Sequence, residues 1–335
     1  MKMPWFLPIL SLIILSLSPV AAGASVFKIA TIAPEGAFEV VQMQAAAAEI
    51  KDKTQSRVSF KFFTGGVMGS DQGVLRKIRI RQLQGGAVSS GSLSAIYPDS
   101  QIYSLPLVFR SMGEVDYVRK TLDPVLTKGY EDAGFVIFGI AEGGFAQIMS
   151  TNPVASIHDL QNQKAWVPEN DKSAFEAVKA FGVSPIPLSI ADVRTGLQTG
   201  MINTVAIPPA YAILLHWHTQ VKYITQLPLI YTFGVLAIDK GAFMELSGPD
   251  QAVVREILGS AFARMDKHNR NQNDEAMALL KTDGIQEVVP DAPTVAQWRE
   301  KAQNAIAIMA GHNILSKNIV DTLDRLLSEF RNKKP

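Results

Sequence analysis

The 335-residue chain contains no cysteine. This absence excludes disulfides, thiolate metal sites, thiol nucleophiles and a lipid anchor on a processed N-terminal cysteine. The chain also has almost no excess of one charge over the other, since it contains 32 Lys and Arg and 31 Asp and Glu, a formal net charge of +1. Such a balance argues against nucleic acid or an anionic membrane surface as a partner.

Motifs for catalysis or metal binding are also missing. The five histidines are scattered, and only His216 and His218 are close; residues two apart do not share a helix face. There is no His-Glu-x-x-His motif and no Gly-x-Ser-x-Gly elbow, and Gly65-Gly66 with Gly69 lacks the Gly-Lys-Ser/Thr of a phosphate loop. We therefore expect no enzyme activity, no metal and no cofactor.

The first 24 residues have the pattern of a cleaved signal peptide. Lys2 precedes an apolar run at 6–17, and Ala22-Gly23-Ala24 supplies the small residues of a cleavage site. The alternative is a membrane anchor, but the run falls short of the roughly 20 residues that a bilayer span needs. We expect cleavage after Ala24 and, without a lipid anchor, a mature protein free in the periplasm.

Short apolar, β-rich segments alternate with helical patterns through most of the remaining chain. This order predicts βαβ units, mostly parallel sheets and an α/β fold. Strands are expected at 27–32, 59–63, 86–90, 135–140, 164–167, 186–188, 204–207 and 234–238, with helices at 37–53 and 71–83.

The last third is helical. From Pro249 no helix breaker occurs until Gly284, which predicts one long helix or two joined end to end. At about 1.5 Å per residue it would span roughly 50 Å, more than one domain of this size, and it could brace two. Two amphipathic helices, at 294–309 and 317–330, follow. About 310 mature residues also favour two domains, interleaved because no linker is visible.

The most distinctive segments are FFTGGVMGSD at 62–71, SLPLVFR at 104–110 and VSPIPL at 183–188, followed by Asp192-Val193 and LQTG at 197–200. In this order they resemble blocks of the substrate-binding proteins of tripartite ATP-independent periplasmic (TRAP) transporters. The resemblance implies a periplasmic binding protein-like fold, with two α/β lobes joined by hinge crossings and a long helix bracing both. A ligand would be enclosed as the lobes close and then be delivered to the TRAP membrane subunits. We place one lobe at 25–143 with 232–271, and the other at 144–231 with 272–335.

The resemblance also implies a bidentate salt bridge between a ligand carboxylate and an arginine, two residues before the proline of a Lys-x-Arg-x-Pro strand. Here the strand is KAWVP at 164–168, so Trp166 replaces that arginine. A second arginine position falls on Ala146, beside Phe145, and an asparagine position falls on Ile207. Two other pocket positions, one for asparagine and one for an aromatic residue, fall on Ile32 and Ile190.

An enclosed ionised carboxylate without a partner costs several kcal/mol. An apolar ligand instead gains roughly 25 cal/mol for each Å² removed from water. We therefore expect a small, largely apolar ligand. The candidate binding residues are Trp166, Ile207, Ala146, Phe145, Ile190, Ile32, Ser89, Ser90, Tyr211 and Trp217.

Other interpretations stay open. Trp166 could pack in a lobe core while another cation, such as Arg194, binds an organic acid. The fold could also host an envelope enzyme or a structural component without a ligand. LHWHTQVKY at 215–223 resembles, together with Trp166, a sub-branch some of whose members have a tetratricopeptide-repeat partner protein. Trp217 and His218 could line the cleft or cement the core.

Overall fold

The computed structural model describes residues 24–311 and 314–333. The expected signal peptide at 1–24 lies outside this part of the chain except for Ala24. Across the described ranges, no helix has the length and apolar content to cross a membrane.

The structure has ten strands and eleven α-helices in the described residues, with four short 3₁₀ helices. The strands are β1 (Ser25–Thr31), β2 (Val58–Phe63), β3 (Gly85–Ser89), β4 (Phe135–Val136), β5 (Ala141–Ser150), β6 (Trp166–Pro168), β7 (Ile186–Leu188), β8 (Thr204–Ile207), β9 (Tyr223–Asp239) and β10 (Gln286–Val288). The helices are α1 (Phe38–Lys53), α2 (Asp71–Arg79), α3 (Met112–Asp132), α4 (Ile157–Gln161), α5 (Lys172–Ala180), α6 (Val193–Gln198), α7 (Pro209–Leu214), α8 (Lys240–Met244), α9 (Gly248–Thr282), α10 (Ala292–Gly311) and α11 (Lys317–Lys333). The 3₁₀ helices are η1 (Ser90–Leu93), η2 (Pro98–Ser104), η3 (Ile190–Asp192) and η4 (His218–Gln220).

One mixed sheet runs through the molecule in the order β2-β1-β3-β9-β5-β8, with β4 and β10 also paired to β9, and β6 pairs with β7 separately. Strand β1 is parallel to β2 and β3, but β9 is antiparallel to β3 and β5. The expectation of mostly parallel sheets is therefore wrong at the centre of the fold. The reason is that β9 and β5 pass between the two halves of the molecule in opposite directions, which brings two crossings side by side.

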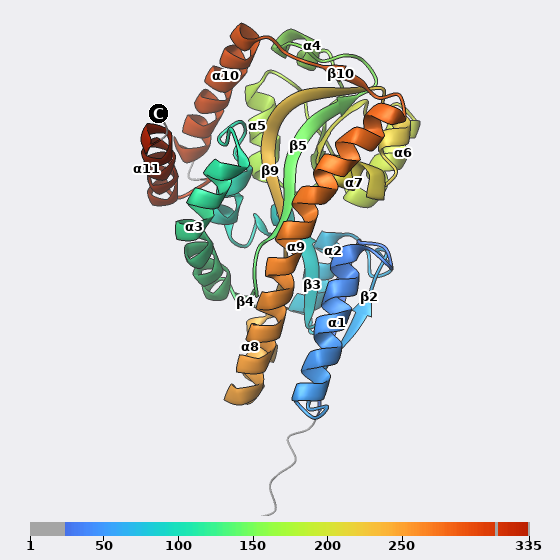
Figure 1. The fold of residues 1–335 in the computed structure, drawn as a ribbon, viewed down its shortest axis with the longest axis vertical. Coiled ribbons are helices and arrows are strands. Elements are labelled where there is room, and N and C mark those ends of the chain that lie inside the picture. Colours follow the sequence, from blue (N-terminus) through green and yellow to red (C-terminus); the bar gives the residue numbers. More distant parts are fainter. Residues whose placement is uncertain (1–23, 312–313, 334–335) are drawn as a thin grey trace, which may run out of the picture.

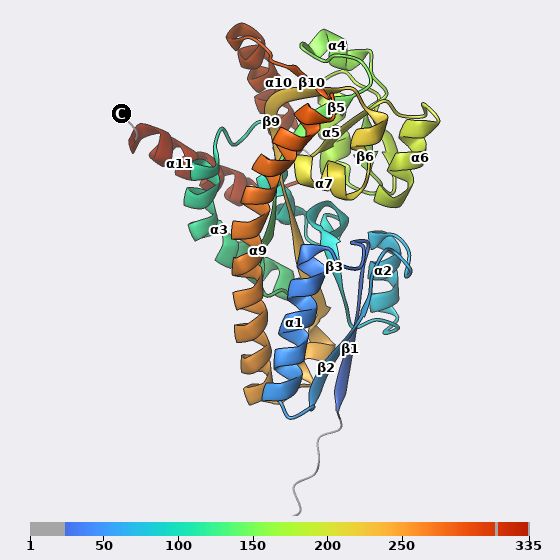
Figure 2. The same cartoon turned by 45° about the vertical axis from the view of Figure 1, so that its right-hand side comes forward.

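The predicted two-lobe α/β architecture is confirmed (Figure 1). One lobe holds β1 to β3 with α1 and α2, and the other holds β6 to β8 with α4 to α7. Helix α9 is a single helix of 35 residues that extends along both lobes, as Figure 2 shows from a second side. Its start is fixed by Ser247, whose side chain accepts a hydrogen bond from the Asp250 amide, and by a proline in the first turn. Helix α11 packs against α3, so it contacts an element expected in the first lobe although the sequence division assigned it to the second.

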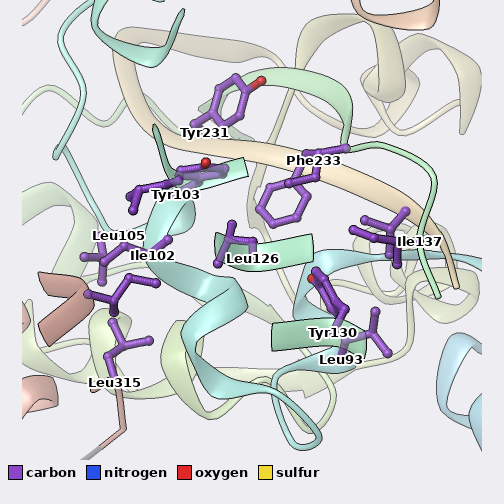
Figure 3. Close-up of a cluster of buried hydrophobic side chains, with 14 of the residues drawn as sticks. Leu93, Ile102, Tyr103, Leu105, Leu126, Tyr130, Ile137, Tyr231, Phe233 and Leu315 are labelled. Atoms are coloured by element: carbon purple, nitrogen blue, oxygen red, sulfur yellow. The ribbon is translucent and has the colours of Figure 1, made fainter. Parts of the chain in front are cut away.

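A large hydrophobic core cluster lies where η2, α3, β9 and α11 meet (Figure 3). Tyr103 from η2 sits at its centre, with its ring edge-on to Phe233 at 5.7 Å and to Tyr231 at 6.3 Å between centroids. Leu126 of α3 and Leu315, just before α11, complete the packing. These contacts hold the crossing strand β9 against the helices of the outer layer.

A buried ion cluster lies beside this core, where β5 begins. Glu142 is only 1% exposed and accepts a salt bridge from Arg270 of α9 (Nη2 to Oε2, 2.8 Å). Arg270 also binds Asp116 of α3, and Arg119 of α3 binds Asp266 of α9 (2.8 Å). Burial raises the pKa of Glu142 above its ordinary value even though Arg270 opposes the rise. The charge on Glu142 is therefore tolerated because of the arginines from two different helices.

Arg270→Met should lower the free energy of unfolding by about 3 kcal/mol, because it leaves Glu142 buried with a single, more distant arginine. Urea denaturation would measure the change. Arg325→Met, which removes an exposed pair with Glu329 on α11, is the matched control and should change stability by less than about 0.5 kcal/mol. Equal effects of the two substitutions would contradict the role assigned to the buried cluster.

Candidate functional site

A cavity of about 330 Å³ lies between the lobes. The end of β1, β3 and η1 contribute its walls from one lobe, and β6, α5, β8 and α7 contribute them from the other. Residues of the crossing strands β5 and β9 and of α9 close the remaining side. The volume is within the range of small-molecule sites in proteins.

Eight of the ten residues expected at the ligand line this cavity. They are Trp166, Ile207, Ile190, Ile32, Ser89, Ser90, Tyr211 and Trp217. They come from both lobes, as a site closed by lobe movement requires.

Phe145 and Ala146 are the two exceptions, and their expected place in the cavity wall is corrected. Ala146 is fully buried and pairs with Ile230 on β9, while the Phe145 ring packs on Tyr231 at 5.8 Å. The pairing of β5 with β9 shifts register on both sides of these residues, between Glu142 and Gly144 and between Ala146 and Ile148. Such irregularities re-aim side chains, and here Gly143 and Ile148 reach the cavity instead.

Trp166 occupies the cavity wall on β6 and is 9% exposed. Its indole nitrogen donates a hydrogen bond to the carbonyl of Leu188, at 3.0 Å. The ring meets Trp217 edge to face, with centroids 5.2 Å apart. Because its only donor is bound to the protein, Trp166 presents only apolar atoms to a ligand.

The alternatives left open for Trp217 and His218 have different outcomes. Trp217 is 2% exposed, belongs to the core cluster of its lobe and also reaches the cavity wall. His218 does not line the cavity; its Nδ1 lies 3.1 Å from the carbonyl oxygen of Ala212. One aromatic ring thus serves both as core and as cavity surface.

Most polar side chains of the wall are bound to other parts of the protein. Ser104 donates to the Tyr231 carbonyl, Thr232 donates to the Gly144 carbonyl, and Asn269 donates to the Glu142 carbonyl. Because these donors are already bonded to backbone oxygens, they add little polarity to the surface that a ligand meets.

The hydroxyl of Ser89 is also occupied. It donates to Asp71 Oδ2 at 2.9 Å, and Ser92 donates to the same oxygen at 2.7 Å. Burial raises the pKa of Asp71 despite these bonds. The Ser89 hydroxyl is therefore fixed by a buried acid that does not itself line the cavity.

Of the described residues that line the cavity, none is Lys, Arg or His. Arg194, the alternative cation, is exposed on α6 and does not line the wall. The charged groups that do reach it are the carboxyl groups of Glu39 and Asp171. Among the residues that the structure describes, no three His, Cys, Asp or Glu side chains lie close enough together to bind a metal ion.

The sequence analysis did not single out Asp171. It lies three residues after Pro168, precedes α5 and is 7% exposed, and its Oδ1 accepts a hydrogen bond from the Ala174 amide at 3.0 Å. Burial raises its pKa to about 6, and the amides of Ala174 and Ser173 only partly offset that rise. An aspartate before a helix signals a cap, and nothing in the sequence pattern shows that this cap also faces a cavity.

Trp298 and Asn269 were also missed. Trp298, on α10, is fully buried at one end of the cavity, and Asn269 is contributed by the long helix α9. Neither lies near a motif, so only the packing of helices from the last third of the chain could have revealed them.

The comparison with protein families gives one match, to "Bacterial extracellular solute-binding protein, family 7" (DctP), over residues 29–312. Among curated relatives, the sialic acid-binding periplasmic protein SiaP of Vibrio cholerae is 21% identical, with 92% of this chain and 97% of that protein covered. The ectoine-binding periplasmic protein TeaA of Halomonas elongata is 25% identical, over 74% of this chain and 73% of TeaA.

Two solved structures have the same fold. The sugar acid-binding protein DctPAm of Advenella mimigardefordensis, in complex with galactonate, is 18% identical with a TM-score of 0.84, covering 92% of this chain and 99% of that one. A TRAP periplasmic solute-binding protein of Desulfovibrio salexigens with bound orotic acid is 17% identical with a TM-score of 0.83, covering 91% and 99%. The chain therefore belongs to bacterial extracellular solute-binding protein family 7.

Proposed function

We propose that this receptor encloses a small, largely apolar molecule between its lobes and passes it to TRAP membrane subunits. The observation that supports this most directly is the cavity wall, in which the described residues include no cationic side chain. Trp166, Ile190 and Ile207 supply apolar surface there instead. Burial of an apolar ligand against such a wall gains roughly 25 cal/mol for each Å².

The names of several relatives favour a second class of ligand, the organic acids. SiaP is named for sialic acid, and the solved structures include complexes with galacturonate and orotic acid. A carboxylate in the present cavity would meet two acids and no cation, so its desolvation would go uncompensated. The electrostatics of the wall therefore favour the apolar ligand.

Two other functions, an enzyme and a structural component that binds no ligand, have less support. An enzyme would need a base and a nucleophile that converge in the cavity. Ser89 lines the wall, but the acid to which it is bonded, Asp71, does not, and no His lines the wall among the described residues. A structural component that had lost binding would show a filled cleft, whereas the cavity holds about 330 Å³. The relatives SiaP and TeaA are named as binding proteins as well.

Within this proposal, the two lobes move as separate bodies. The first lobe comprises residues 25–143 and 232–271, and the second comprises residues 144–231 and 272–311. Helix α11 moves with the first lobe, because it packs on α3 and shares the core cluster of Tyr103. The crossings of β5 and β9 then act as the hinge.

Two further proposals follow from the sequence. The signal peptide is removed after Ala24 and the protein works in the periplasm, where the curated relatives are named as binding proteins. A tetratricopeptide-repeat protein assists the receptor, as the resemblance of 215–223 to one sub-branch suggests; co-purification of that protein with the receptor from the native host would test this.

Intact-mass measurement on the exported protein should give a chain that begins at Ser25. Retention of the first 24 residues would contradict cleavage, and cleavage at another bond would move the boundary. Expression without residues 2–24 is the control and should leave the protein in the cytoplasm.

Naphthalene should stabilise the protein against heat, whereas succinate and D-galacturonate should not. At a free ligand concentration of about 100 times Kd, binding adds about 2.7 kcal/mol to the free energy of unfolding. Thermal denaturation with each compound at matched concentration measures this. Stabilisation by the acids alone would overturn the apolar assignment.

Trp166→Arg should weaken naphthalene binding at least about tenfold, because a guanidinium group would have to be desolvated in the closed cavity. Trp166→Phe is the control: it keeps an apolar ring, loses the bond to the Leu188 carbonyl and should stay within about threefold of the parent. Isothermal titration calorimetry on folded protein, verified by circular dichroism, gives both values. Unchanged affinity in the arginine variant would remove Trp166 from the site.

A further inference from the structure

The two acidic residues on the cavity wall, Glu39 and Asp171, differ in their hydrogen-bond partners. Glu39, on α1, is half-buried and accepts a hydrogen bond from the Tyr211 hydroxyl at 3.5 Å. Asp171 is buried, and among the described residues its carboxyl group receives hydrogen bonds from backbone amides in the first turn of α5 and from no side chain. No described Lys, Arg or His forms an ion pair with it.

The position of Asp171 places this carboxyl group at the boundary between the lobes. Oδ1 caps α5, while Oδ2 faces Gly91 in η1 of the opposite lobe so closely that a Cβ at Gly91 would collide with it. Both residues line the cavity. A carboxylate in such a place is costly unless a proton or a cationic partner neutralises it.

Helix capping alone does not explain this arrangement. Asp239 caps α8 in the same way, through a bond from the Ala242 amide to Oδ1 at 2.8 Å, and it does not line the cavity. Asp171 also caps a helix, but its Oδ2 in addition faces the opposite lobe. Among the described residues, the cavity there has no cationic side chain. The carboxyl group has no cationic partner among the described residues, and a cation on the ligand would supply one.

We propose that Asp171 binds the ammonium group of the ligand, so that the receptor's ligand is an apolar molecule carrying a primary amine. This inference rests on the apolar ligand proposed above and adds its polar end. The ammonium group would contact Asp171 from the cavity side, next to the close approach of Asp171 to Gly91, with Glu39 adding negative potential from the same lobe as η1, and the hydrocarbon part would extend along Trp166 and Ile207. Because the ammonium site includes groups from both lobes, binding there favours the closed form.

The test compares three ligands with the same chain: octylamine, 1-octanol and octanoate. By calorimetry near neutral pH, where octylamine is protonated, the amine should bind about tenfold or more tightly than the alcohol, and the alcohol more tightly than the acid. Asp171→Asn retains the cap, because Asn is an equivalent capping residue, and removes the charge. It should reduce octylamine affinity about tenfold or more and leave octanol affinity within about threefold.

Asp239→Asn is the matched control and should change neither affinity. Octanoate binding as tightly as octylamine would overturn the inference, and so would an Asp171→Asn variant that keeps the full preference for the amine. If octanol and naphthalene bind but the amine has no advantage, only the ammonium site is wrong. If no octyl compound and no naphthalene binds, the apolar proposal fails with it.

Discussion

Burial of the Glu142 charge is the constraint on which the arrangement of the two lobes depends. This carboxylate is neutralised by Arg270 from α9, with Arg119 from α3 3.9 Å away, so β5 and two helices from distant parts of the chain must meet at one point. The carbonyl of Glu142 also accepts a bond from Asn269, which lines the cavity. The need to neutralise one buried carboxylate therefore constrains the position of α9, which contributes one wall of the cavity.

The cavity above this cluster combines apolar walls with unbalanced negative charge. Several of its hydroxyl and amide donors are bonded to backbone carbonyls, and the Trp166 indole is bonded to Leu188, whereas the Trp298 indole nitrogen has no partner among the described residues. Fold and ligand class are thus set by different residues. The family fold is retained at 17% to 18% identity with the two solved structures compared above, while the electrostatic character of the wall depends on a few side chains.

The sequence predicted those elements whose local signals agree with their tertiary setting. Helix α9 is one, since Pro249 and a long stretch without breakers leave few alternatives, and the strand at 204–207 is another. Only the end of strand β9 was predicted, at 234–238, because Pro228 and polar residues interrupt the alternation in the earlier part of its 17 residues. Eight candidate residues line the cavity, whereas Phe145 and Ala146 lie on a strand whose bulges no pattern in the sequence reveals. Asp171 was missed because a cap signal describes only the local backbone.

Helix α9 has one more mechanical consequence. Its first half packs on α1 in the core that includes Val40 and Met43, and its second half reaches Leu280 in the core around Trp166 and Trp217. Because the helix is embedded in both cores, the proposed opening of the cleft would have to bend it or slide it over α1 or α7. The bending stiffness of a single helix of 35 residues would then oppose wide separation of the lobes.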